Sequence, residues 1–293
     1  MVVVSAGVRS RTTAGIVQMC SGVACLCVND AVAKILTADY SPLQILFMRN
    51  IIALPIAMLI ALKMGGTSAL QSHRPIAHLV RGILWLGAAG LFFTSMKYLE
   101  LAEATALVFV APVFVTALSA VLFREKVGWR RWSAVLIGFF GVLIVVRPGT
   151  GTFQAASLLP VATAFLYAWL MIGARWVDAR ESVWTLMLYL VGAGALLSAL
   201  VQPFVWVEPR PEDMWLFLGV ALFGTIGITL ITQAFRLAPA PVVAPLEYSA
   251  LIWATAFGWL IWGEIPDLVT YLGAVVIILS GVFIVFRERQ LEN

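Results

Sequence analysis

Charged residues are scarce in this chain: Asp, Glu, Lys and Arg make up 12% of its 293 residues, whereas hydrophobic residues make up 62%. Soluble domains contain about a quarter charged residues, so an ordinary water-soluble fold is excluded. There are only two histidines. The sequence has no His-Glu-x-x-His motif, no Gly-x-Ser-x-Gly motif and no carboxylates with metal-ligand spacing. It therefore predicts neither a catalytic site nor a metal site.

Cysteine is also limited, to Cys20, Cys25 and Cys27 in the first apolar segment. That segment offers no polar surroundings to deprotonate a thiol, so we interpret all three as apolar filler and expect no metal or cofactor. The net charge is +4, but the basic residues are scattered between apolar runs. Because no basic face is available to follow a phosphate backbone, nucleic acid is not an expected partner.

What the sequence does contain is long apolar segments. Each charge-free run is long enough for the roughly 20 residues that a helix needs to cross a bilayer. The runs are 104–123, 148–174, 182–207, 214–235 and 268–286. The sequence therefore predicts an all-α membrane protein.

Shorter apolar runs raise the predicted number of membrane-spanning helices to ten. The second, third and ninth are the least certain, since Arg49, Arg81 and Glu247 lie within them. The predicted helices are 12–37, 42–62, 75–97, 101–123, 130–147, 153–174, 182–203, 213–235, 240–262 and 268–287.

The basic residues predict the orientation of these helices. One set of loops and ends contains fourteen Lys and Arg residues, whereas the opposite side has only Lys97, Arg147 and Arg210. Basic residues gather on the cytoplasmic side, so we expect an inner-membrane protein with both termini in the cytoplasm. The fourteen are Arg9, Arg11, Lys63, Arg74, Arg81, Arg124, Lys126, Arg130, Arg131, Arg175, Arg180, Arg236, Arg287 and Arg289.

Two stretches of the chain resemble each other. In both, an apolar segment ends at a Glu and a later apolar run closes on Gly-Val; Glu125 and Glu264 are 139 residues apart, and Gly141 and Gly281 are 140 apart. The chain thus divides into residues 1–148 and 149–293, each with five predicted helices. Copies with an odd number of spans insert in opposite orientations, an arrangement typical of transporters.

This doubled pattern, from Pro112 through Glu125 to Gly141 and again from Leu251 through Glu264 to Gly281, resembles the drug/metabolite transporter superfamily. Within it, the chain is most similar to the ten-span branch with two EamA-type repeats. The resemblance implies two inverted five-helix repeats around a central cavity. The first four helices of each repeat are expected to form the wall of that cavity.

A shorter segment gives a finer resemblance. Residues 245–253 are similar to bacterial exporters of aromatic amino acids, of the YddG type. Two features depart from the family pattern. Leu251 stands where the first copy has Pro112, and Arg49 has no basic counterpart in the second copy. The two halves are therefore expected to contribute different groups to a shared site.

Charges inside the apolar spans are the first candidates for function, because a charge at the bilayer centre costs at least about 3 kcal/mol. The spacing of Asp30 and Lys34 predicts an ion pair within one helix, and Arg49 lies at a depth from which it could share Asp30. We interpret Asn29, Asp30 and Arg49 as substrate-binding candidates and Lys34 as a gating residue. The alternative is a purely structural ion cluster.

Glu247 is a further candidate, for binding an ammonium group or coupling transport to protons; the alternative is a hydrated residue near the surface. Deep aromatic residues could line a cavity and stack on a substrate ring, or simply contact lipid. They are Trp85, Phe109, Tyr167, Trp169, Tyr248 and Trp253.

Other residues are assigned structural roles. Pro112, Pro160 and Pro245 are expected to bend or break helices, and Glu125 and Glu264 to orient loops. His73 and His78 are interpreted as solvated or capping residues.

The predicted function is the export of small metabolites, amino acids including aromatic ones, by alternating access. Exporters of other amphipathic metabolites or drugs are the alternative; an intramembrane enzyme and a channel are less well supported. The expected partners are a small-molecule substrate and the bilayer. The sequence leaves the exact substrate, the coupling ion and the oligomeric state open, a monomer included.

Overall fold

The computed structural model describes residues 2–122, 129–149, 153–173 and 181–292. Every regular element in these ranges is helical, which confirms the all-α prediction. The α-helices are α1 (Val2–Leu36), α2 (Pro42–Gly65), α3 (Pro75–Ser95), α4 (Leu101–Val108), α5 (Ala111–Leu122), α6 (Trp129–Val146), α7 (Leu158–Ile172), α8 (Val183–Ala199), α9 (Gln202–Val205), α10 (Met214–Leu237), α11 (Ala240–Val243), α12 (Ala250–Phe257) and α13 (Leu268–Glu292). Short 3-10 helices cover Thr67–Leu70, Ala155–Ser157, Pro211–Asp213 and Ala244–Ser249, and a π-helix covers Gly258–Trp262.

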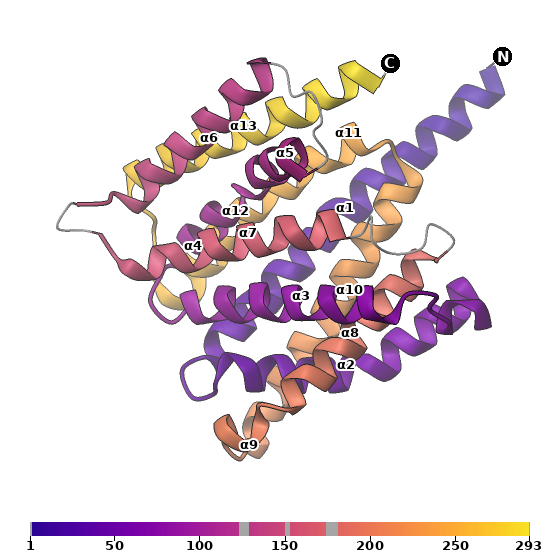
Figure 1. The fold of residues 1–293 in the computed structure, drawn as a ribbon, viewed down its shortest axis with the longest axis vertical. Coiled ribbons are helices and arrows are strands. Elements are labelled where there is room, and N and C mark those ends of the chain that lie inside the picture. Colours follow the sequence, from indigo (N-terminus) through magenta and orange to yellow (C-terminus); the bar gives the residue numbers. More distant parts are fainter. Residues whose placement is uncertain (1, 123–128, 150–152, 174–180, 293) are drawn as a thin grey trace.

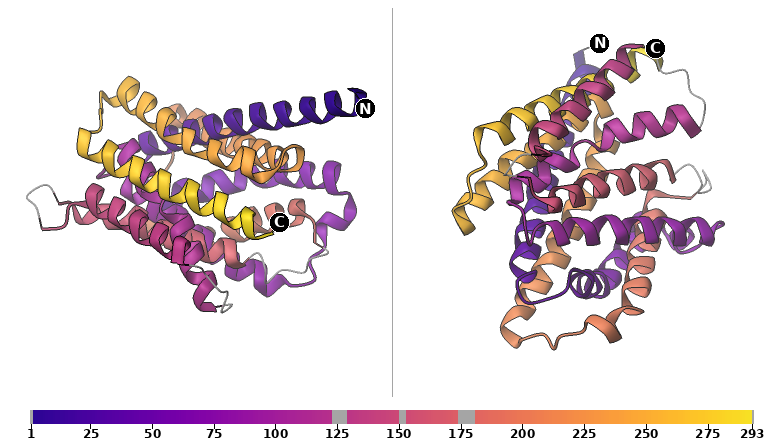
Figure 2. Two further views of the ribbon diagram at one scale, coloured as in Figure 1. Left: turned by 90° about the horizontal axis from the view of Figure 1, so that it is seen from above. Right: turned by 60° about the vertical axis from the view of Figure 1, so that its left-hand side comes forward.

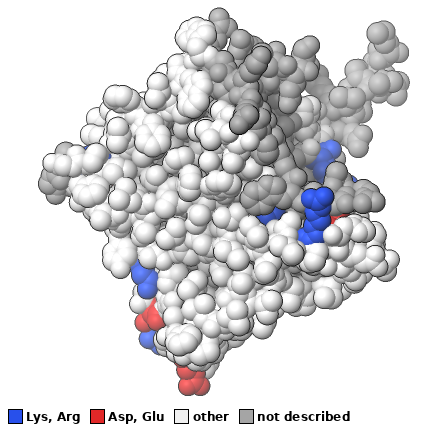
Figure 3. Space-filling view, in the orientation of Figure 1, with Lys and Arg blue, Asp and Glu red and all other residues white. Residues whose placement is uncertain are grey.

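Six helical segments in the described residues are long and apolar enough to cross a membrane. They are Thr12–Leu36, Pro42–Gly65, Pro75–Ser95, Leu101–Leu122, Ala155–Ile172 and Pro211–Leu237. Three shorter apolar helices add to them: Trp132–Val146, Val183–Ala199 and Leu268–Ile284. Figure 3 shows a face that is mostly free of charged side chains, with those visible lying toward its sides. The chain is a multi-pass membrane protein, and its predicted count of ten spans stays a prediction.

Helices from the two halves of the chain pack against each other in matched pairs. α2 lies along α8 and α6 lies along α13, as Figure 1 shows for the second pair. These pairs join the second predicted helix to the seventh and the fifth to the tenth. α1 packs along α10 and α3 along α7. In the predicted numbering these pairs are the first helix with the eighth and the third with the sixth. If the two repeats exchange places, each pair becomes the other.

Glycines allow the closest of these contacts. A Cβ added at Gly141 of α6 would lie 3.0 Å from the carbonyl oxygen of Gly273 in α13, and one added at Gly273 would lie 3.0 Å from that of Gly141. The backbones of the two helices therefore touch, and both positions require glycine. Both chain ends lie at the same end of the bundle (Figures 1 and 2).

Two of the predicted helices are interrupted. The fourth is broken between α4 and α5 at Phe109 and Val110, where Pro112 has no N–H to continue the helix. The ninth is divided into α11, the 3-10 helix that contains Pro245, and α12. Both breaks were predicted. Pro160, by contrast, lies in the first turn of α7 and does not break it, because a proline there displaces no helical hydrogen bond.

The two interruptions meet in space. The rings of Phe109 and Tyr248 lie edge to face, with centroids 5.0 Å apart. These residues are also 139 positions apart, the separation that relates Glu125 to Glu264. Equivalent positions of the two sequence copies are thus in direct contact.

Candidate functional site

A polar cluster is buried where α1, α2 and α3 meet. α1 contributes Asn29 and Asp30, whose side chains share a hydrogen bond of 2.8 Å from Asn29 Nδ2 to Asp30 Oδ1. Arg49 of α2 is 9% exposed and lies close enough to Asp30 for their charges to interact. Its guanidinium stacks over the ring of Trp85 from α3, 5.3 Å from the centroid. The structure thus brings Arg49 close to Asp30, as the sequence suggested, and adds Trp85, which was predicted only as one of the deep aromatic residues.

Helices of the second half close over this cluster through glycines. A Cβ at Gly224 of α10 would lie 2.7 Å from Asn29 Oδ1 and 2.8 Å from Arg49 Nη2. A Cβ at Gly194 of α8 would lie 2.8 Å from Asn50 Nδ2. Any larger residue would displace these polar groups. The cluster therefore lies at the boundary between the two halves, which is where relative movement of the halves would act on it.

The cluster has hydrogen-bonding capacity that the described part of the protein does not use. Asn29 Oδ1 and Asn50 Nδ2 are buried and have no partner among the described residues. Buried polar groups are normally paired, and leaving one unpaired costs about 1–3 kcal/mol. With Arg49 and Asp30, these atoms offer donors and acceptors side by side. Sequence reasoning missed Asn50, although it follows Arg49 directly within an apolar span.

Glu247 belongs to a second group of candidates. It lies on the 3-10 helix Ala244–Ser249, so its predicted place inside a regular α-helix is wrong. Its side chain is exposed. Tyr167 of α7 and the neighbouring Tyr248 lie within electrostatic range of its carboxylate. Tyr167 is 41% exposed. With Phe109 against Tyr248, the group presents one carboxylate among three aromatic rings.

Two other predicted aromatic residues have ring contacts on their own helices. Trp169 lies edge to face with Phe165, with centroids 6.4 Å apart. Trp253 stacks on Phe257 at 6.0 Å. Their assignment to a cavity stays a prediction.

Lys34 does not form the predicted ion pair with Asp30. Its ammonium group lies 2.6 and 2.7 Å from the two carboxylate oxygens of Glu264, 230 residues away, and donates to the carbonyl of Leu99 at 3.1 Å. The ring of Trp262 covers it at 4.7 Å. Glu264 also accepts from the backbone N–H of Leu101 at 3.3 Å. The carboxylate therefore ties the end of α1 and the start of α4 to the segment before α13. Glu125, its counterpart, lies outside the described residues.

Further polar contacts between the halves surround this pair. Arg147 binds Asp267, and its hydrogen bond and that of Thr270 lower the pKa of Asp267 to about 2. Arg210 pairs with Asp39 at 3.1 Å. We call this end of the bundle the Lys34 end. The opposite end, where α2 finishes and α3 begins, is called the His78 end.

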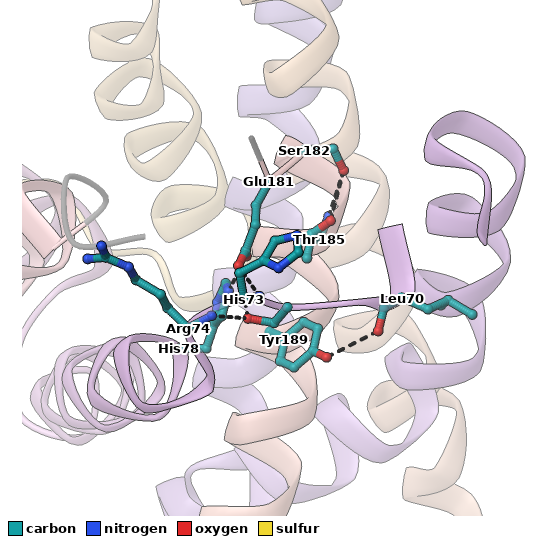
Figure 4. Close-up of polar contacts among 9 residues, drawn as sticks. Leu70, His73, Arg74, His78, Glu181, Ser182, Thr185 and Tyr189 are labelled. Carbon is teal, nitrogen blue, oxygen red and sulfur yellow. Dashed lines mark hydrogen bonds and ion pairs between the residues drawn. The ribbon is translucent and has the colours of Figure 1, made fainter. Parts of the chain in front are cut away.

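The His78 end has a bridge of its own between the halves (Figure 4). His78 Nε2 lies 2.6 Å from Glu181 Oε2, with side-chain exposures of 2% and 1%. The carboxylate also accepts from Ser72 Oγ at 3.0 Å and from the backbone N–H of His73 at 2.7 Å. Tyr189 stacks on His78. The interpretation of His78 as a solvated or capping residue is therefore wrong, because its partner lies 103 residues away.

Glu181→Gln tests this bridge through pH. Burial alone would raise the pKa of Glu181, but the hydrogen bonds from His78, His73 and Ser72 hold that pKa below the usual value for a Glu side chain. A carboxyl with a depressed folded-state pKa stabilises the fold above its unfolded pKa and loses that contribution as pH falls through the lower value. As pH falls from about 6 to about 3, the unfolding temperature of the native protein should drop more than that of Glu181→Gln. At neutral pH, the substitution should lower the free energy of unfolding by about 2 kcal/mol.

The readout is the unfolding temperature in detergent across that range. Glu208→Gln, at an exposed position, is the matched control and should keep the native slope. An unchanged slope in Glu181→Gln would contradict the assignment.

Comparison with known proteins finds one family model that matches both halves of the chain, and several similar transporters. The sequence profile of the EamA-like transporter family matches residues 13–147 and again residues 154–287. An S-adenosylmethionine uptake transporter of Rickettsia prowazekii (strain Madrid E) is 26% identical over 267 residues, 90% of this chain and 89% of that protein. A riboflavin transporter of Vibrio cholerae is 32% identical over 215 residues, 73% of this chain and 72% of that protein. A pseudopaline exporter of Pseudomonas aeruginosa is 25% identical over 258 residues, with 86% and 89% covered.

A solved crystal structure supports the fold. It matches 97% of this chain and 99% of its own, with a TM-score of 0.63 and 20% sequence identity. None of the three relatives just described is named as an exporter of aromatic amino acids, so that finer resemblance is not confirmed.

Proposed function

Since the chain belongs to the EamA-like transporter family, we propose that it exports small amphipathic metabolites, with amino acids, aromatic ones included, as its substrate class. The observation that carries this proposal is the polar cluster of buried Asn29, Arg49 and Asn50 with half-buried Asp30. Asn50 Nδ2 and Asn29 Oδ1 have no partner in the described part of the chain. Arg49 and Asn50 Nδ2 suit a carboxylate, whereas Asp30 and Asn29 Oδ1 suit an ammonium group. Trp85 supplies an apolar face beside them.

The alternative is export of other amphipathic metabolites or drugs. The relatives favour this breadth, since they are named for three different small molecules, and both uptake and export occur among them. An intramembrane enzyme remains the less supported class. Assaying for a chemically altered product during transport would reveal it.

The proposed mechanism is alternating access by two inverted repeats, residues 1–148 and 149–293. It is supported by the helix pairs that convert into one another when the halves are exchanged and by the contact between Phe109 and Tyr248. The distribution of Lys and Arg supports an inner membrane location with both termini in the cytoplasm. In this arrangement the Lys34 end faces outward, and its ion pairs close it.

Transport into proteoliposomes tests the substrate class. Phenylalanine, threonine, nucleobases and sugar phosphates are compared as substrates and as competitors, with and without a pH gradient. The proposal expects saturable counterflow of the amino acids. It is wrong if the amino acids neither move nor compete while the sugar phosphates do.

Glu247→Gln tests the second group of candidates. Gln keeps the size of the side chain but can neither ionise nor attract an ammonium group, so we expect at least a tenfold loss of amino acid flux driven by a pH gradient. Glu208→Gln is the matched control, because its position is also exposed but lies outside both candidate groups. If pH-dependent transport survives Glu247→Gln unchanged, the proton-coupling role is to be abandoned.

A further inference from the structure

A second buried arginine, besides Arg49 of α2, is Arg81 of α3. The site described above does not use its guanidinium. Arg81 is 6% exposed and lies about 9 Å along the helix axis from Pro75, at 1.5 Å per residue. Its Nε and Nη1 atoms have no hydrogen-bond partner in the part of the chain that the structure describes. No described carboxylate forms an ion pair with it either.

The other buried charges described above are compensated. Lys34 binds Glu264, His78 binds Glu181, and Arg49 lies near Asp30 with its face on Trp85. A cation at the bilayer centre costs at least about 3 kcal/mol, and a buried cation without a partner is unfavourable at any depth because it has lost its hydration. Arg81 differs from the others, and an anionic group from outside the chain would remove that cost.

The position of Arg81 indicates where such an anion would come from. His78, Arg81 and Trp85 follow each other at spacings of three and four residues, so they lie along one face of α3. His78 marks one end of the bundle, and Trp85 contacts Arg49 of the polar cluster. The neighbouring Gly82 packs against Ala193 of α8, which belongs to the second half. Arg81 is therefore an intermediate position between the His78 end and Arg49.

We propose that Arg81 is an anion-binding station on the transport path, which holds the carboxylate of a substrate before it reaches Arg49. This inference rests on the proposed function. It narrows the substrate class to molecules with a carboxylate and predicts that an isolated carboxylate binds without being transported. The phosphate of a lipid headgroup offers the same anionic chemistry and is the competing source.

The test uses the purified full-length protein in detergent micelles and benzoate as the probe. Benzoate binding is measured from the shift in unfolding temperature for the native protein, Arg81→Gln, Arg81→Lys and Arg74→Gln. Loss of a charged hydrogen bond corresponds to roughly 10- to 100-fold weaker binding. Arg81→Gln should show that loss, whereas Arg81→Lys keeps the charge and should bind within about fivefold of the native protein. Arg74→Gln, the matched control, removes an exposed arginine at the N-cap of α3 and should bind normally.

Stability provides a second readout. Because no described residue pairs with Arg81, its removal leaves none of them uncompensated, and Arg81→Gln without ligand should unfold at the native temperature or above it. A variant that unfolds earlier or does not fold would show that Arg81 has a structural partner and would overturn the proposal. Equal benzoate shifts in the native protein and Arg81→Gln would also overturn it. So would an Arg81-dependent shift with added phosphatidylglycerol but none with benzoate, which would assign the site to lipid.

Flux measurements separate this inference from the proposed function. If Arg81→Gln weakens benzoate binding while the native protein moves no amino acid, the anion station stands and the proposed substrate class is wrong. If phenylalanine is transported with an unchanged KM in Arg81→Gln, the proposed function stands and the station is wrong. The expected result is a KM raised at least tenfold, with kcat changed less.

Discussion

Arg49→Gln should lower the transport of amino acids by about 100-fold. The substitution removes the only cation described in the polar cluster, and a hydrogen bond between charged groups contributes about 1.5–3 kcal/mol. It also removes the guanidinium that stacks on Trp85. A Cβ added at Gly224 would lie 2.8 Å from Arg49 Nη2, so α10 packs closely against the side chain that the substitution changes. Initial rates of counterflow in proteoliposomes measure the loss.

Two further variants separate charge from geometry at this position. Arg49→Lys keeps the charge but has no planar fork to bind a carboxylate with two hydrogen bonds, so an intermediate rate is expected. Arg236→Gln is the matched control, since Arg236 stacks over Trp184 at 5.7 Å in the same way but lies at the end of α10. It should transport at nearly the native rate. Equal rates for Arg49→Gln and Arg236→Gln would show that Arg49 has no part in substrate binding.

Lys34→Met should destabilise the fold by about 3 kcal/mol. The ion pair between Lys34 and Glu264 is mostly buried, with side-chain exposures of 8% and 24%. Removing one partner of such a pair leaves the other charge desolvated and uncompensated, which costs more than the pair itself contributes. Among the described residues, Glu264 would keep only its hydrogen bond from the N–H of Leu101.

The double variant Lys34→Met with Glu264→Gln should recover most of that loss, because it leaves no unpaired charge behind. Arg210→Met is the control: its pair with Asp39 is exposed on both sides, at 55% and 47%, so solvent screens it and its loss should change stability little. Thermal unfolding in detergent gives the order. A double variant that is no more stable than Lys34→Met would mean that Lys34 acts mainly through Leu99 or Trp262.

The sequence predicted the helices well because their signal is local. An apolar run of sufficient length specifies a spanning helix without reference to the rest of the chain. The breaks near Pro112 and Pro245 were also predictable, since a proline acts on its own turn. Asp30 and Arg49 were identified as candidates for the same reason, because a charge inside an apolar run is conspicuous.

Partners distant in sequence were not predictable. The spacing of Asp30 and Lys34 satisfied the rule for an ion pair within a helix, yet Lys34 reaches Glu264 on the other half. His78 likewise has its partner in the second half, at Glu181, just before α8 begins. Residue spacing predicts only contacts within one helix. Which charged partner lies nearest to a side chain depends on how that helix packs against others. The unpaired atoms of Asn50 and Arg81 became visible only once burial was known.

The contact between Phe109 and Tyr248 has a mechanical consequence under the proposed inverted arrangement. An axis that exchanges the two halves passes between these rings, so the operation that converts one end state into the other maps their contact onto itself. The two rings can then stay together throughout the cycle and act as its fulcrum. The ion pair between Lys34 and Glu264 closes one end of the bundle in this arrangement, so it must open once in every turnover.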